Sequence, residues 1–498
     1  MQTLDASSEN RPDAFAQTTF DQDDWRSGYR SQPEEFAYWI EDIEGEIPSD
    51  LTGTLFRIGP GLLDVAGHPV RHPFDGDGMV NAIAFKNGRA FYHNRYVKTE
   101  AYMAEQKASK PLYRGVFGTQ KPGGWLANAF DLKLKNIANT NIVYWGERLL
   151  ALWEAAEPHR LDPTTLDTLG LDDLWGTISS GGAFTAHPRI DPACSQADNQ
   201  PCLVGFAVKP GLSSTITLME FGPSGSLVHQ HSHVIPGFAF LHDFALTPHY
   251  AIFFQNPVSF NPLPYVLGFK GAAECLQFEP KQPTRIILIP RDGTSPVRTF
   301  EADPCFVFHF ANAFEQGGEV IIDAVCYEGF PSVEDGNDYQ NVDFDKVPEG
   351  QLYRFKLDLA LNTVETHNLI SRCCEFPSLH PNHMGRAYRY LYIGATHKSA
   401  GNAPLQAVLK RDLETGEEQL WSIAPRGFTG EPIFVPWPNG TREDDGWVLM
   451  LLYNAERRCS ELAILDGQNI SNEIARLKLN HHVPYGLHGS FVSAYFGP

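Results

Sequence analysis

Short β-rich runs, each closed by turn residues, recur along almost the whole of this 498-residue chain and leave little room for helices. Examples are PHYAIFFQ (248–255), TRIILIP (284–290), EVIIDAVCY (319–327), YRYLYIG (388–394) and GWVLMLLY (446–453). Val, Ile, Tyr and Phe favour strands, while the Gly, Pro, Asn and Asp between the runs favour turns. The pattern predicts an all-β fold. The best helix candidate is TEAYMAEQKAS (99–109), with Thr99 as its N-cap.

Two segments have the pattern of a hairpin at the outer edge of a sheet: LYRFKLDLALNTVETHNL (352–369) and LQAVLKRDLETGEEQLWSI (405–423). A β-propeller repeats such hairpins around one axis, although no clean fixed-period repeat allows its blades to be counted here. No linker rich in Gly, Ser or charge interrupts the chain, so we predict a single domain from residue 22 to residue 498. The polar segment 1–21 is expected to be disordered or loosely attached.

The composition excludes some functions and favours others. A net charge of −21 argues against nucleic-acid binding, which needs a basic face for the phosphates. The cysteines show no CxxC spacing and the N-terminus has no secretory pattern, so we expect reduced thiols in a cytoplasmic protein, without an obligate protein partner. Phe alone accounts for 33 residues, which suits a β structure or a pocket for a flat apolar ligand.

Four histidines lie in four separate strand-like segments and are the first candidates for chemistry: His187, His242, His309 and His488. Alternation in GFAFLHDFALT places His242 on a face lined by Phe, and alternation in CFVFHFANAFE groups His309 with Val307 and Ala311. If the fold brings the four together, they form a metal site made of imidazoles alone. The alternative is four ordinary core histidines, because a single buried His is more often hydrogen-bonded in the core than bound to a metal.

Other patterns narrow the chemistry. No HExxH, GxSxG or GxGxxG motif is present, which argues against the usual zinc-protease, serine-hydrolase and dinucleotide sites. Three glutamates lie in apolar contexts: Glu154, Glu375 and Glu431. Each needs a buried partner, which is either a metal-bound imidazole, an arginine such as Arg372, or the backbone of a turn. The strip of His229, His231 and His233 is interpreted as a solvated strand face rather than a metal site.

Eight motifs occur in an order that resembles the carotenoid cleavage oxygenase family. They are LTGTLFRIGPG (51–61), HPFDGDGMV (72–80), AHPRIDP, FLHDFALT, FVFHFANAFE, RCCEFP, GEPIFVP and LHGS, and the resemblance extends from about residue 22 to the C-terminus. KNIANTNI, LLALWE and HHVPYGLHGS are most similar to the cyanobacterial branch that cleaves apocarotenoids at the 15,15' bond. Eight ordered motifs over the full chain are far more specific than any one of them.

The resemblance implies a seven-bladed β-propeller with a cap of loops and short helices over an axial non-haem iron site. It implies that Fe(2+) is bound by His187, His242, His309 and His488, with O2 as cosubstrate. It also implies that three glutamates orient three of these ligands, leaving His187 without one: Glu154, Glu375 and Glu431. Thr140 is expected beside an open position of the metal, and Trp153 and Phe308 in the substrate and O2 pocket.

A water-insoluble polyene needs an apolar tunnel whose entrance reaches lipid. The segment 107–135 mixes apolar side chains with six basic residues against one acidic residue, a net +5 in a strongly acidic chain. Apolar side chains ringed by Lys and Arg are typical of interfacial membrane contact, although a core segment with a solvated rim is the alternative. The residues expected at the membrane or tunnel entrance, including a second lip at 261–270, are Leu112, Phe117, Trp125, Leu126, Leu263 and Tyr265.

These observations predict a non-haem Fe(II) dioxygenase that cleaves a C=C bond of an apocarotenoid with O2, at the 15,15' bond to give retinal. The protein is expected to be cytoplasmic and peripherally associated with membranes. Two alternatives stay open. One is a stilbene-cleaving dioxygenase of the same fold, whose relatives use a Tyr and Lys pair to recognise a phenol. The other is a non-catalytic propeller that binds carotenoid.

Overall fold

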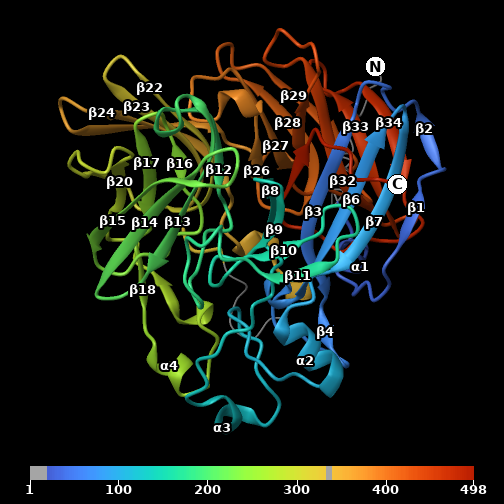
Figure 1. Ribbon diagram of the computed structural model, residues 1–498, viewed down its shortest axis with the longest axis horizontal. Helices are drawn as coiled ribbons and strands as arrows, with labels where there is room; N and C mark the ends of the chain where they lie inside the picture. The colour runs from blue at the N-terminus through green and yellow to red at the C-terminus, as the bar shows by residue number, and fades with distance from the viewer. Residues whose placement is uncertain (1–19, 332–338) are drawn as a thin grey trace, which may run out of the picture.

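A ring of β-sheets surrounds one axis in the computed structural model, which describes residues 20–331 and 339–498 (Figure 1). In this described part of the chain, seven sheets of four to six strands form the ring. Two small sheets accompany them, formed by β4 (Asp64–Val65) with β5 (His68–Pro69), and by β18 (Val258–Phe260) with β19 (Leu276–Phe278). The predicted seven-bladed propeller is confirmed.

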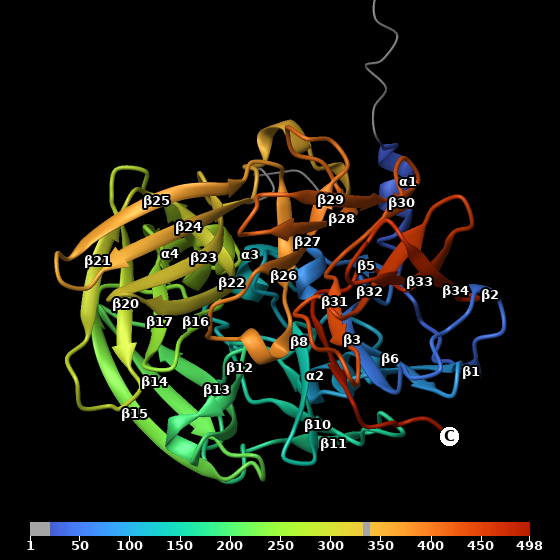
Figure 2. The same ribbon diagram turned by 90° about the horizontal axis from the view of Figure 1, so that it is seen from above.

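Five consecutive blades each use four antiparallel strands. In the order across each sheet they are β8 (Asn141–Trp145), β9 (Arg148–Leu152), β10 (His159–Leu161), β11 (Thr168–Leu171); β12 (Arg189–Cys194), β13 (Gln200–Lys209), β14 (Ser213–Phe221), β15 (Leu227–Pro236); β16 (Ala245–Leu246), β17 (Tyr250–Gln255), β20 (Thr284–Pro290), β21 (Arg298–Ala302); β22 (Phe306–Gln316), β23 (Glu319–Tyr327), β24 (Gln351–Asp358), β25 (Thr363–Ile370); and β26 (Cys374–Ser378), β27 (Tyr390–Thr396), β28 (Leu405–Asp412), β29 (Glu418–Ser422). The first strand of each blade forms one edge of its sheet, and Figure 2 shows these edges near the centre of the ring. The predicted hairpins, β24–β25 and β28–β29, form the opposite edges, as expected.

The two ends of the chain close the ring. One blade combines β1 (Ala37–Trp39), β7 (Arg89–Tyr96), β6 (Asp77–Lys86), β3 (Gly53–Leu62) and the last strand, β35 (Gly489–Val492). The other combines β2 (Ile43–Gly45), β34 (Glu473–Lys478), β33 (Cys459–Asp466), β32 (Gly446–Asn454) and β30 (Gly427–Phe428), and β31 (Ile433–Pro436) also pairs with β32. Because β3 pairs with β35, the segment that carries His488 is held against a strand from the start of the chain.

Loops and short helices cover one end of the ring, at the bottom of Figure 1. They include α2 (Glu100–Ala108), α3 (Gly124–Asn128) and α4 (Leu263–Val266). The helix expected at 99–109 is α2, and the Thr99 hydroxyl accepts from the Tyr102 N–H at 3.0 Å. These elements form the predicted cap.

The N-terminal part of the described chain is attached to the propeller. Asp21 caps α1 (Gln22–Ser27) by accepting from two backbone N–H groups, and the ring of Phe20 packs edge-on against Phe344 at 5.5 Å. These two residues belong to the packed chain, although the expectation had placed both in the loosely attached segment. Residues 1–19 lie outside the described residues.

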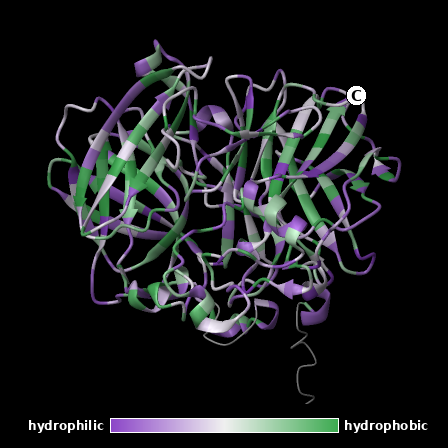
Figure 3. Cartoon of the chain, turned by 60° about the horizontal axis from the view of Figure 1, so that its bottom comes forward, coloured by the Kyte–Doolittle hydropathy of each residue, from purple (hydrophilic) through white to green (hydrophobic). Residues whose placement is uncertain are grey.

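Apolar side chains fill the spaces between neighbouring blades. Phe254 of β17 packs against Phe310 of β22 and Phe355 of β24, with ring centroids 5.0 Å apart in both pairs. Figure 3 shows hydrophobic segments along the strands of the blades, with hydrophilic loops around them. Burial of apolar surface, at about 25 cal/mol per Å², therefore holds the ring together without strand pairing between most blades.

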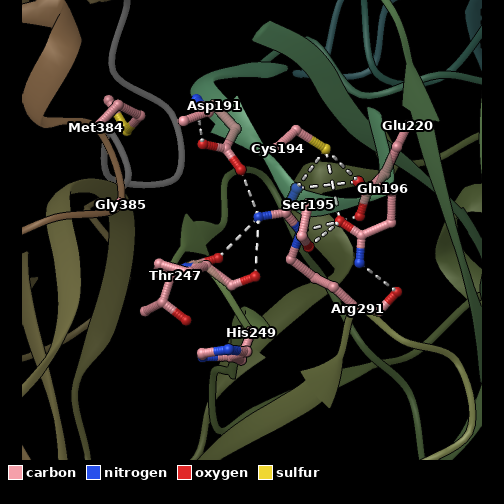
Figure 4. A network of polar contacts seen from close by, with 12 residues as sticks. Asp191, Cys194, Ser195, Gln196, Glu220, Thr247, His249, Arg291, Met384 and Gly385 are labelled. Carbon is pink, nitrogen blue, oxygen red and sulfur yellow. Dashed lines mark hydrogen bonds and ion pairs between the residues drawn. The ribbon is translucent and has the colours of Figure 1, made fainter. Parts of the chain in front are cut away.

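A buried ion network links the β12–β15 blade to the β16–β21 blade (Figure 4). Arg291 lies just after β20 and contacts Asp191 of β12 at 2.6 Å and Glu220 of β14 at 2.9 Å. These three side chains are at most 1% exposed. Asp191 also binds Arg386 at 2.8 Å, and the Cys194 thiol donates to Glu220 at 3.1 Å. The guanidinium therefore fixes one blade against the next.

Candidate metal centre

The four candidate histidines meet on the axis of the propeller. His309 lies in β22, while His187, His242 and His488 lie in the segments that lead into β12, β16 and β35. One ring nitrogen of each lies within 4.8 Å of the other three, and the Nε2 atoms of His187 and His242 are 3.0 Å apart. Nε2 of His309 is buried and has no hydrogen-bond partner in the described part of the chain. Four imidazole lone pairs converging on one point form a donor set that suits a transition-metal ion such as iron.

A glutamate fixes the orientation of three of these rings. Oε1 of Glu154 lies 2.8 Å from Nδ1 of His242, Oε2 of Glu375 lies 2.6 Å from Nδ1 of His309, and Oε1 of Glu431 lies 2.9 Å from Nδ1 of His488. Each contact uses Nδ1, which leaves Nε2 for the centre. Among the described side chains, no carboxylate bonds to the ring of His187. The glutamate pairing follows the arrangement that the resemblance implied.

Burial alone would raise the pKa of Glu375, but the facing His309 outweighs it and holds that pKa below its usual range. The same holds for Glu154 opposite His242. For Glu431 the opposing groups are Arg57 and then His488. The three glutamates are therefore carboxylates at neutral pH, which makes the surroundings of the centre strongly negative.

Three further residues support the glutamates, and the sequence analysis did not assign them. The Tyr327 hydroxyl donates to Oε1 of Glu375 at 2.8 Å, and Nη1 of Arg57 bonds to Oε2 of Glu431. Phe376 donates its N–H to Glu375 at 2.6 Å from a backbone φ of 60°, in the left-handed region that strains a residue with a side chain. Its ring packs 5.6 Å from that of His309. A positive φ has no signature in residue type, whereas Arg57 lay within the motif LTGTLFRIGPG without an assigned role.

A cavity of about 780 Å³ extends from the histidines toward the cap. Thr140, Trp153 and Phe308 line it. Other aromatic walls are Phe74, Phe117, Phe240, Phe330 and Phe376. Burial lowers the pKa of His72, another wall residue, to about 3, so it carries no charge at neutral pH. The cavity is within the ~300–1,000 Å³ range of small-molecule sites and is suited to an apolar ligand.

Of the six expected entrance residues, three are exposed on the cap and three are partly or fully buried. Trp125, Leu126 and Leu263 project from the cap and are 49%, 72% and 60% exposed. Leu112 is half-buried and Phe117 lies in the cavity wall. Tyr265 is only 9% exposed, and its ring packs under the guanidinium of Arg114 at 4.4 Å. Tyr265 therefore supports the cap from inside and does not present a surface.

Two of the six basic residues of segment 107–135 are buried. Arg114 is fully buried and donates to the carbonyls of Asn128, Asp131, Tyr265 and Lys270, which tie the two cap loops together. Lys135 is buried between Asp77 and Glu105, at 2.8 Å from each. The net charge of +5 therefore overstated the surface charge, because sequence does not reveal which cations point inward. Three lysines of the segment remain exposed: Lys107, Lys110 and Lys133.

The strip of alternating histidines in β15 also differs from the expectation. The rings of His229, His231 and His233 lie on the half-buried face of the strand, while Gln230 and Ser232 between them are exposed. Adjacent rings are 4.9 and 5.0 Å apart. The predicted solvated face is therefore wrong. The histidines lie on the more buried face of this strand, and the residues between them lie on the exposed face.

Comparison with known proteins identifies this arrangement. The family model described as "Retinal pigment epithelial membrane protein" matches residues 29–493. The chain belongs to this family, which is also that of the carotenoid oxygenases.

Relatives in the family cover nearly the full chain. Apocarotenoid-15,15'-oxygenase from Synechocystis is 56% identical over 96% of this chain and 98% of its own length. Lignostilbene-alpha,beta-dioxygenase isozyme III from Sphingomonas paucimobilis is 30% identical over 91% of this chain and 93% of its own. The crystal structure of cobalt-substituted Synechocystis ACO superimposes with a TM-score of 0.95 at 56% identity, covering 96% of this chain and all of that one.

Proposed function

We propose that this carotenoid oxygenase family member is a non-haem iron dioxygenase that cleaves one C=C bond of an apocarotenoid with O2. The double bond and both oxygen atoms are consumed, and two carbonyl products form. The observation that carries the proposal is the four-histidine centre at the inner end of an aromatic cavity. The 15,15' bond, and therefore retinal as product, is proposed from the identity of 56% to the Synechocystis apocarotenoid-15,15'-oxygenase.

In this proposal the four histidines hold Fe(2+), which supplies a centre that activates O2 without an added cosubstrate. The three glutamates hold the ligand rings in place and balance the charge of the ion inside the core. Thr140 lines the cavity beside the centre, and its carbonyl accepts from the His488 N–H at 3.3 Å. We therefore assign Thr140 to the surroundings of an open position of the metal.

The cavity walls do the remaining work. Phe308, Trp153 and Phe240 offer flat apolar surfaces to a polyene and exclude water from it. Aromatic faces also stabilise positive charge that develops along the polyene. No general acid or base is required, and the depth to which the ligand enters selects the bond.

The cavity favours an apocarotenoid over a stilbene. Tyr327 and Lys270 both line it, as a phenol-binding pair would. However, the Tyr327 hydroxyl already donates to Glu375, and burial raises the pKa of Tyr327 well above its usual value. Because its only proton goes to a glutamate of the centre, the Tyr327 hydroxyl does not donate to a phenol and offers it only acceptor lone pairs.

The proposal is tested by aerobic incubation of the iron-loaded protein with apocarotenals of graded length, and with resveratrol in parallel. Products are identified by mass after reaction under ¹⁸O2. We expect retinal from the apocarotenals, ¹⁸O in the new aldehydes and no reaction of resveratrol. Preferential cleavage of resveratrol, or cleavage of the polyene at another bond, would contradict the assignment.

The variant Glu375→Gln is expected to bind ferrous iron about 10- to 100-fold more weakly, the usual cost of losing a carboxylate that orients a ligand. His309 then faces a neutral amide, which no longer raises the basicity of its ring. The dissociation constant is measured anaerobically by competition with a ferrous chelator. Glu315→Gln is the matched control. Glu315 bonds to His249 over 2.9 Å, and this pair lies at the surface, away from the axis. An affinity unchanged by Glu375→Gln would show that this glutamate does not tune the ligand.

We further propose that the tips of the cap contact a membrane surface, from which the insoluble substrate enters. Six large apolar side chains are exposed on cap segments 124–132 and 263–269: Trp125, Leu126, Phe130, Leu132, Leu263 and Phe269. The rings of Trp125 and Phe269 lie 5.4 Å apart, which joins the two loops into one patch. In the described residues, no helix is long and apolar enough to cross a bilayer. The contact is therefore proposed as peripheral.

The double variant Leu126→Glu/Phe130→Glu is expected to lose most vesicle binding. Each buried apolar side chain contributes about 1.5–3 kcal/mol, so the partition coefficient should fall at least ~10-fold per substitution. Binding is measured by co-sedimentation with vesicles, and turnover is measured on substrate in detergent, where it should be unchanged. Leu212→Glu is the control, because Leu212 is a fully exposed leucine in another loop. Equal binding by variant and wild type would exclude the patch as the contact.

A further inference from the structure

Arg57 is buried behind the metal centre and bonds to one of the glutamates that orient the histidines. Its side chain is 6% exposed, in the middle of β3. Nη1 bonds to Oε2 of Glu431, and Nη2 donates to the carbonyl of Leu487 at 3.0 Å. Glu431 orients the ring of His488, and Leu487 directly precedes His488 in the chain. One guanidinium therefore holds both the carboxylate that faces this histidine and the backbone that carries it.

The charges around the centre do not balance without Arg57. Three carboxylates face the four histidines, whereas a divalent ion supplies only two positive charges. Glu375 receives its other hydrogen bonds from the neutral Tyr327 hydroxyl and a backbone N–H, and Oε2 of Glu154 has no hydrogen-bond partner among the residues that the structure describes. Arg189, which is close in sequence to His187, is already paired with the buried Asp243 at 2.5 Å. An unbalanced buried charge costs several kcal/mol.

We propose that Arg57 is a positioning residue that completes the charge balance of the metal centre and fixes Glu431 and His488 for the ion. The inference rests on the proposed function, because the ion is the proposed Fe(2+). With the ion, the three carboxylates and the guanidinium, the buried assembly is neutral as a whole. The planar fork of Arg also reaches two acceptors at once, which a lysine amine does not do in the same geometry.

The charge balance leads to a prediction that a purely structural role of Arg57 does not make. Arg57→Gln leaves one excess negative charge, and Glu431→Gln leaves one excess positive charge. The double variant Arg57→Gln/Glu431→Gln is neutral again, and the amide oxygen introduced at position 431 is still able to accept from Nδ1 of His488. We therefore expect Glu431→Gln to bind ferrous iron at least ~10-fold more weakly, because the unopposed guanidinium repels the ion, and the double variant to bind it more tightly than Glu431→Gln. Arg57→Gln weakens binding only through the lost positioning of Glu431 and His488, because the loss of a nearby positive charge by itself favours a cation.

The experiment measures the ferrous dissociation constant of the four proteins anaerobically against a chelator, with circular dichroism of the metal-free forms to establish folding. Arg57→Lys is included, because it keeps the charge but does not reach Glu431 and the Leu487 carbonyl together, and it therefore separates charge from positioning. If Arg57→Gln does not fold, the comparison of Glu431→Gln with the double variant still decides the question. A double variant that binds ferrous iron no more tightly than Glu431→Gln would overturn the inference.

Arg354→Gln controls for the general loss of a buried ion pair. Arg354 binds both oxygens of Asp323 at 2.8 Å, and neither residue lines the cavity. Its iron affinity should equal that of the wild type. Failure of the inference and failure of the proposed function are distinct outcomes. If the wild-type protein binds no ferrous iron, the function fails. If it binds iron and the double variant binds no more tightly than Glu431→Gln, only the role of Arg57 fails.

Discussion

The variant His242→Ala is expected to lose both iron and turnover. Its Nε2 lies 3.0 Å from Nε2 of His187, and its Nδ1 bonds to Glu154 at 2.8 Å. The substitution removes one of four donors and leaves the Glu154 carboxylate facing an empty space. Loss of an orienting carboxylate alone costs about 10- to 100-fold in metal affinity, so the loss of a ligand should exceed that. The measurements are iron per protein by mass spectrometry and the decay of polyene absorbance in air.

The control for this prediction is His249→Ala. His249 also bonds to a glutamate, Glu315, at 2.9 Å, but its side chain is 75% exposed on the surface. Iron content and turnover should match the wild type, which separates the effect of the centre from that of losing any imidazole–carboxylate pair. Retained turnover in His242→Ala would falsify the metal role of the cluster.

The sequence predicted the parts of this molecule that depend on local pattern. The apolar surroundings of His242 predicted its burial, and the structure brings His242 and His309 together. Strict alternation did not place them, because His242 precedes β16 and a β-bulge interrupts the register of β22 at His309. The turn residues between the runs predicted hairpins, and Thr99 predicted the start of α2. The number of blades could not be counted from the strand pattern. The blades differ in their loop lengths, and the C-terminal strand β35 belongs to the same sheet as the N-terminal strand β3.

The errors concern contacts that residue type does not encode. Arg114 and Lys135 resemble surface cations in the sequence, yet each is buried with its own set of acceptors. Tyr265 resembles an exposed aromatic residue at a lip, yet it is covered by that same Arg114. Arg57 lies far in sequence from Glu431, so only the folded chain places the guanidinium on the carboxylate. Long-range partners of buried charges are set by how the blades meet, which a single sequence does not show.

Arg291→Gln is expected to destabilise the fold by about 3–5 kcal/mol, the usual cost of breaking a buried ion pair by removing one partner. Glu220 loses two hydrogen bonds of 2.9 Å and keeps only the weak Cys194 thiol donor. Asp191 is less affected, because it retains Arg386 at 2.8 Å. The measurement is the urea midpoint of the metal-free protein, followed by circular dichroism. Iron affinity of the folded protein should be unchanged, since none of these residues lines the cavity.

The double variant Arg291→Gln/Glu220→Gln separates an unpaired charge from lost packing. If the stranded Glu220 carboxylate causes the loss, its neutralisation should recover part of the stability, and the two substitutions will not be additive. Arg411→Gln provides the surface control: Arg411 pairs with Glu418 at 2.8 Å with both side chains partly exposed, and the loss should stay below ~1 kcal/mol. A double variant no more stable than Arg291→Gln would mean that the guanidinium stabilises the blade junction through its shape and carbonyl contacts rather than its charge.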